Sequence, residues 1–115
     1  MTQFSVDSHF DGRSPAVREI YNAIVAASQK FGEIAEDPKK TSIHLNNKTA
    51  FAGIATRREF LILTIKSDRD IKSVRIFKRE QTSANRWHHE IKLHNVKDVN
   101  AELKSWLKEA YHLSV

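Results

Sequence analysis

Apolar side chains recur every three or four residues in two segments, one near each end of the chain. This spacing places them on one side of a helix, so the pattern predicts two amphipathic helices. The first helix is predicted to begin with Ser14 as its N-cap and Pro15 as its first residue, and to end at Gly32. Candidate N-caps between Asn95 and Asp98 start the second. The predicted buried stripes are Val17, Ile20, Tyr21, Ile24, Ser28 and Phe31, and Val99, Leu103, Trp106, Leu107, Ala110 and Tyr111.

Between these helices, apolar and polar residues alternate with the period of β-strands. After a polar connection at residues 33–40, residues 41–45 and 48–55 predict a hairpin across Asn46-Asn47, with Ile43 opposite Ala50. In this register Phe51 falls on the polar face with Lys40 and His44. Residues 73–78 predict a further strand with Val74 turned inward, followed by a polar loop at residues 80–86.

Residues 60–65 are apolar on both sides, which is typical of a central strand. An apolar second face also suggests that the outer side of the sheet is partly covered. An N-terminal arm, a helix or a second subunit would each supply such a cover.

The segment 87–93 carries the only histidine pair and one of the two tryptophans. As a strand it would turn Trp87, His89, Ile91 and Leu93 to one side and the intervening residues to the other. The first set is mostly apolar, so it predicts a core face. His89 is then expected to be a hydrogen-bonded core histidine, while His88, Glu90 and Lys92 face outward.

These elements together predict an α+β two-layer sandwich, with an antiparallel sheet of about five strands and an N-terminal and a C-terminal helix. A chain of 115 residues that is 40% hydrophobic is long enough for one core only. We therefore expect a single domain at residues 14–115, preceded by an arm at residues 1–13.

Composition excludes several kinds of site. The chain has no cysteine, which rules out disulfides and thiolate chemistry, and its three glycines form no phosphate-cradling loop. No apolar run approaches the length of a membrane span, and the N-terminus has no leader pattern. We expect a cytoplasmic protein that does not associate with membranes.

Charge is distributed unevenly along the chain. Residues 39–92 hold 13 basic and 5 acidic residues, a balance of +8, whereas the rest of the chain has a balance of −3. The predicted sheet is therefore basic, and an anionic partner should prefer it. Basic side chains interleaved with aromatic rings on a sheet are what nucleic acid or a nucleotide requires, because cations neutralise phosphate and rings stack on bases.

Several blocks of the sequence resemble a bacterial family of domains of unknown function, the one numbered fifty-six fifty-five. They are KKTSIHL at residues 39–45, TAFAG at 49–53, SANRWHHE at 83–90 and WLKEAY at 106–111. The resemblance covers residues 10–113. It implies no established activity, cofactor or catalytic residue.

The leading hypothesis is a small binding module for an anionic ligand, nucleic acid or nucleotide-like, without catalysis of its own. It requires no cofactor, metal or catalytic residue. Asn85 and Arg86, in the loop before the histidine strand, could grip a phosphate or serve only to hold the loop. The expected ligand-binding residues are Lys40, His44, Phe51, Arg86, His88, Glu90 and Lys92.

Enzymatic and structural alternatives remain open. His44, His88 and Glu90 could together hold a transition metal, and the histidines could act as general acids or bases. Asp70 with Glu90 and Lys92 could form a nuclease-like magnesium site. Either arrangement would make the protein a hydrolase of a phosphorylated substrate. The two-sided apolar strand at residues 60–65 would instead favour a homodimeric interaction domain.

Overall fold

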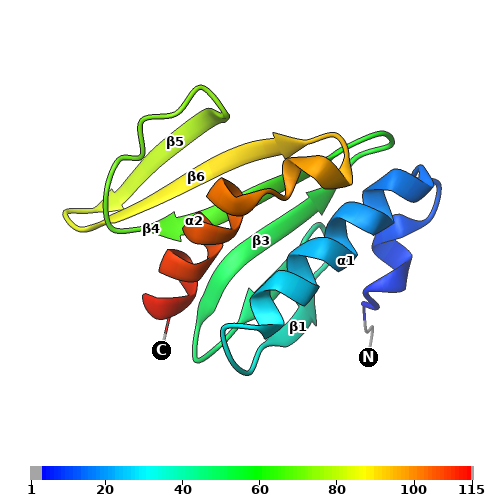
Figure 1. The fold of residues 1–115 in the computed structure, drawn as a ribbon. Helices are drawn as coiled ribbons and strands as arrows, with labels where there is room; N and C mark the ends of the chain where they lie inside the picture. Colours follow the sequence, from blue (N-terminus) through cyan, green and yellow to red (C-terminus); the bar gives the residue numbers. More distant parts are fainter. Residues whose placement is uncertain (1–3, 115) are drawn as a thin grey trace.

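The computed structural model describes residues 4–114 as two helices and two short 3₁₀ turns packed on a six-stranded antiparallel sheet (Figure 1). The predicted α+β class is confirmed. The helical elements are η1 (Asp7–Phe10), α1 (Pro15–Gln29), η2 (Val96–Asp98) and α2 (Ala101–His112). The strands are β1 (Ala35–Pro38), β2 (Ile43–Asn46), β3 (Ala50–Thr56), β4 (Leu61–Ser67), β5 (Ile76–Ser83) and β6 (Arg86–Leu93).

Both helices form where the apolar period predicts them. Ser14 is the N-cap of α1, and Pro15 is its first residue. The start of α2 differs from the prediction: Asn95 caps η2, and the side chain of Asn100 accepts the Leu103 N–H at 3.1 Å to cap α2. Gly32 has φ +151°, and a Cβ there would lie 2.3 Å from the Tyr111 hydroxyl, so this position requires glycine.

The sheet order is β1-β2-β3-β4-β6-β5. The edge strand β1 lies inside the segment that the sequence suggested was only a polar connection. It is short and ends at Pro38, whose missing N–H is tolerated in an edge strand. At the other edge β5 lies outside β6, so the last three strands do not follow one another as a simple meander.

The predicted hairpin forms, but its register was wrong. Ile43 lies opposite Ile54 rather than Ala50, and the ladder is irregular where Asn46 pairs with Ala50. Ala50 and Phe51 together lie opposite Asn46, a bulge that turns the side chain of Phe51 to the core side. Phe51 is consequently only 1% exposed and packs edge-on against Tyr111 of α2, with ring centroids 5.4 Å apart. Its expected place on the ligand-binding face was wrong.

The strand predicted at residues 73–78 is shifted along the chain. Val74, expected in the core, is fully exposed, and β5 instead runs through the segment predicted as a loop. Arg75 precedes the strand and donates to the Asp98 carbonyl at 2.6 Å, so it braces the start of α2 rather than the outer sheet face. The charged sequence of β5 fits an edge strand, because charges there discourage pairing with other chains.

Both helices lie on the same side of the sheet (Figure 1). Beneath them is one hydrophobic core, and Phe10 of η1 packs on Tyr21 at 5.1 Å on this side too. The described part of the arm, residues 4–13, therefore lies on the helix side and does not cover the outer sheet face. In the part of the chain that the structure describes, no helix has the length and apolar character needed to cross a bilayer.

Candidate functional site

The outer side of the sheet, which we call the open face, carries rows of side chains that cross several strands. In one row His44, Gly53, Thr64 and Glu90 are successive ladder partners from β2 to β6. In the next rows Ala55 pairs with Ile62, and Ile62 with Lys92, while Lys66 pairs with His88. This pairing brings residues from distant parts of the sequence onto one surface.

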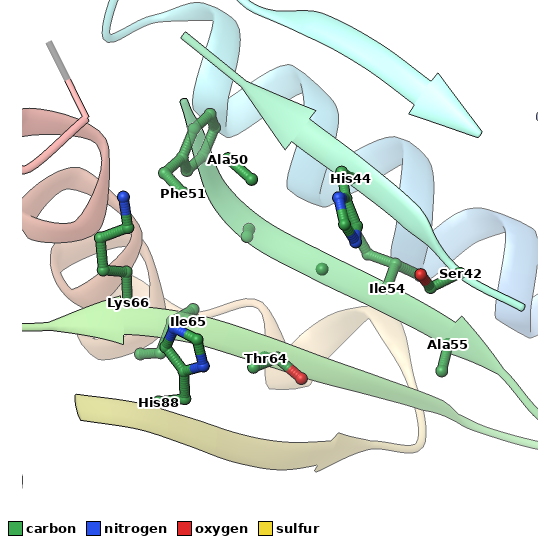
Figure 2. A pocket seen from close by; sticks show the side chains of 12 residues that line it. Ser42, His44, Ala50, Phe51, Ile54, Ala55, Thr64, Ile65, Lys66 and His88 are labelled. Carbon is green, nitrogen blue, oxygen red and sulfur yellow. The ribbon is translucent and has the colours of Figure 1, made fainter. Parts of the chain in front are cut away.

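A trough of about 270 Å³ is hollowed into the open face. Its floor is low because the middle strands carry only small side chains there, those of Gly53, Ala55 and Thr64. His44 on β2 and His88 on β6 stand at opposite sides of this floor (Figure 2). We define the trough by the outward-facing residues Ser42, His44, Gly53, Ala55, Thr64, Lys66 and His88.

Lys66 closes one end of the trough. Its Nζ donates to the side chains of Ser114 and Thr49 at 2.9 and 3.1 Å, which fixes the ammonium at the rim. Partial burial, and secondarily the nearby positive charge of Arg86, lower the pKa of Lys66. Both causes oppose the charged form of the lysine, so an anion at this end of the trough would be favourable to it.

A second patch lies farther along the open face, where Lys92 meets two aromatic rings. Its Nζ lies 4.8 Å from the ring centroid of Phe77 and 5.8 Å from that of Phe60. Phe77 is 47% exposed, which leaves much of the ring accessible. An exposed ring beside a lysine offers both stacking and a positive charge to a ligand.

The structure brings most of the predicted ligand-binding residues onto this face. His44 and His88 flank the trough, and Glu90 and Lys92 follow on β6. Arg86 begins β6, and its guanidinium donates to the Asn85 carbonyl at 2.9 Å, so it holds the loop. Two residues differ: the ring of Phe51 is buried in the core beneath the trough, and Lys40 lies in a separate hollow.

Glu90 is partly neutralised on this face. Lys78 of β5 is its ladder partner, and the ammonium lies 3.6 Å from the carboxylate. Lys78 is exposed and Glu90 is half-buried at the surface, so the pair contributes little to stability. It does reduce the repulsion that a carboxylate on this face would exert on an anion.

The proposed metal and nuclease constellations do not assemble. His44 and Glu90 share a row, but three strand spacings separate them, roughly 14 Å. Within residues 4–114 no group of three His, Asp or Glu residues is close enough to hold a metal ion. Asp70 lies 3.7 Å from His89, on the core side of β6, whereas Glu90 points outward.

His89 is the buried core histidine that the alternation predicts. It is 0% exposed, its Nε2 accepts the Ile71 N–H at 3.2 Å, and its ring stacks on Trp87. The Nδ1 atom, which must then carry the proton, has no partner among the described residues. Burial lowers the pKa of His89, against the opposing effect of the Asp70 carboxylate. This histidine is inaccessible to a ligand on the open face.

The fold and site can now be compared with known proteins. The model of the domain of unknown function DUF5655 matches residues 6–114, nearly the whole chain. The chain belongs to the DUF5655 family. Neither the curated proteins nor the solved structures yielded a significant match.

Sequence reasoning missed part of the trough in this DUF5655 domain. Lys66, Thr64 and Gly53 were not among the predicted ligand-binding residues, although all three line it. The alternation of β4 contains the missing signal: Ile62, Thr64 and Lys66 share one side of a strand, opposite the apolar Leu61, Leu63 and Ile65. The strand order that places Thr64 and Lys66 beside β3 and β6 has no comparable local signal.

Proposed function

We propose that the open face binds an anionic ligand that carries planar rings, with single-stranded nucleic acid or a nucleotide as the leading class. The observation that carries the proposal is the combination, on one accessible sheet face, of the trough and the Lys92 patch. Lys66 and the imidazole rings of His44 and His88 line the trough, and Lys92 lies beside the ring of Phe77 in the patch. Sheet surfaces of this composition suit unstacked bases and their phosphates.

The size of the trough refines the proposal. At about 270 Å³ it is slightly smaller than most ligand pockets, which begin at roughly 300 Å³, and this size suits one base or one nucleotide unit. Its floor allows close approach to the strand backbone at Gly53. A longer single-stranded nucleic acid would continue from the trough toward Phe77, where a second base could stack.

The test is fluorescence anisotropy with labelled single-stranded and double-stranded DNA and RNA, and with a labelled mononucleotide, at low and physiological salt. We expect binding that weakens as salt rises, because phosphate contacts release counterions. The variant His88→Ala/Phe77→Ala/Lys92→Ala should lose most of the affinity. All three side chains are largely exposed, so the fold should persist.

A matched control removes one positive charge from the helix side, through Lys108→Ala on α2. This variant should bind like the parent protein, with only a small change from its altered net charge. Absence of binding to every probe at low salt would contradict the proposal. Equal losses in the control and the triple variant would show that net charge, and not the open face, governs binding.

A further inference from the structure

A second hollow, of about 350 Å³, lies away from the trough, where η1 meets the start of β2 and the end of β3. We call it the basic hollow and define it by His9, Arg13, Lys40, Thr41, Thr56 and Arg57. Three of these residues are permanently cationic, and none of the residues that line it is acidic. This grouping could not be predicted from the sequence, because its members come from three separate segments.

The three cations of the basic hollow differ from half of the protein's arginines, which form ion pairs. The arginine ion pairs within residues 4–114 join Arg18, Arg69, Arg75 and Arg79 to nearby carboxylates. No ion pair in this part of the chain includes Arg13, Lys40 or Arg57. Like charges that line one hollow repel each other, and a bound anion would relieve this repulsion.

Hydrogen bonds hold the hollow in shape around Thr56, whose side chain is buried. Its hydroxyl accepts from Arg13 Nε at 3.2 Å and donates to the His9 carbonyl. Arg57 donates from one terminal nitrogen to the Thr56 carbonyl at 3.1 Å. Arg13 is therefore held through Nε alone, which leaves its two terminal NH₂ groups for a ligand.

We propose that the basic hollow binds a phosphate group through Arg13, Arg57 and Lys40. A guanidinium held at Nε presents a planar pair of donors that matches two phosphate oxygens, and Lys40 adds a point charge. The site is independent of the proposed function of the open face, since the two share no residue. The phosphate could be free or carried on a larger molecule.

The first experiment follows backbone amide resonances of the full chain while inorganic phosphate replaces chloride at constant ionic strength. A second titration uses a mononucleotide, which carries its phosphate on a larger group. We expect saturable shifts at Thr41, Thr56 and Arg57 with at least one probe. Tighter binding of the mononucleotide would identify a carried phosphate, and equal or weaker binding would identify the free anion.

Two variants test whether the basic hollow is the site of phosphate binding. Lys40→Ala/Arg57→Ala should weaken phosphate binding at least tenfold, and Arg13→Lys should weaken it severalfold although the charge is kept, because the planar pair of donors is lost. Both Lys40 and Arg57 are exposed, so their removal should leave the fold intact. The matched control Lys104→Ala/Lys108→Ala removes two charges from α2.

Unsaturable shifts with both probes, or equal weakening in the double variant and its control, would overturn the proposal. His88→Ala serves as a further control for the independence of the two sites. It should leave phosphate binding at the hollow unchanged while it weakens binding on the open face. If the parent protein binds none of the nucleic-acid probes on the open face but keeps the saturable phosphate shifts, the proposed function is rejected and the phosphate site stands.

Discussion

The two faces of the sheet differ in burial, and strand β4 shows this difference within one segment. Leu61, Leu63 and Ile65 lie under the helices and are at most 1% exposed, whereas Ile62, Thr64 and Lys66 point to the open face and are only half-buried. The core face is specified by volume and apolarity, because every side chain there touches several others. The open face has no such demand, so it can carry charges, small residues and exposed rings.

The largest effect should come from truncating neighbouring residues on opposite faces. Leu63→Ala should cost about 2–5 kcal/mol of unfolding free energy, since a fully buried side chain leaves a cavity. Ile62→Ala, next in sequence but half-buried, should cost less than about 1.5 kcal/mol. Urea denaturation of both variants measures the difference. Equal losses would mean that the open face is covered in solution, as a homodimer would require, and the mass in solution would then show it.

A second test fills the trough without touching the core. A Cβ at Gly53 would lie 3.9 Å from both His44 and Thr64, which is ordinary contact, so a side chain can be added there. Gly53→Val should keep or raise stability by up to about 1 kcal/mol, because β-branched residues favour strands over glycine. It should also weaken ligand binding about tenfold or more by occupying the floor.

Gly53→Ala is the graded control, and its binding should lie between that of the parent protein and Gly53→Val. Anisotropy titration and thermal melts on the same samples separate the two effects. A valine variant that binds like the parent protein would place the ligand outside the trough.

The buried histidine of β6, His89, should make the stability of the protein depend on pH. His89 is buried and its pKa is lowered, so the folded protein holds it neutral while the unfolded chain protonates near pH 6.5. The unfolded state then binds more protons, and stability falls as pH drops below about 6.5, by at most about 1.4 kcal/mol per pH unit for this one group. Above that pH its contribution is constant.

Unfolding free energies between pH 5 and 7.5 test this dependence. The parent protein and His88→Gln, which alters an exposed histidine, should share the same slope. His89→Gln should be less stable at neutral pH and should show a flatter slope. If His89→Gln retains the full slope, the acid sensitivity belongs to other groups.

The sequence predicts the core face more completely than the open face, and the residues of β6 and β3 show why. Alternation in residues 87–93 correctly separates His89 from His88, because burial repeats with the period of the backbone. The same reasoning fails for Phe51, because a bulge shifts the period by one residue and nothing in the local sequence marks the bulge. Neither hollow could be predicted from local sequence. The trough depends on the strand order, and the basic hollow depends on a contact between η1 and β3, and both are properties of the tertiary structure.

The smallest expected effect concerns Glu90, the carboxylate in the row that crosses the trough floor. Glu90→Gln removes a negative charge that repels an anionic ligand, and it breaks only an exposed pair with Lys78. Stability should therefore change by less than about 0.5 kcal/mol. At a separation of about 7 Å in a water-exposed site, one charge contributes about 0.6 kcal/mol, so anion binding should tighten about twofold to threefold. Salt titration by anisotropy should show this gain at low ionic strength and its loss at high salt. Weaker binding in Glu90→Gln would instead indicate that the carboxylate accepts a hydrogen bond from the ligand, which would make the open face selective for a donor-bearing base.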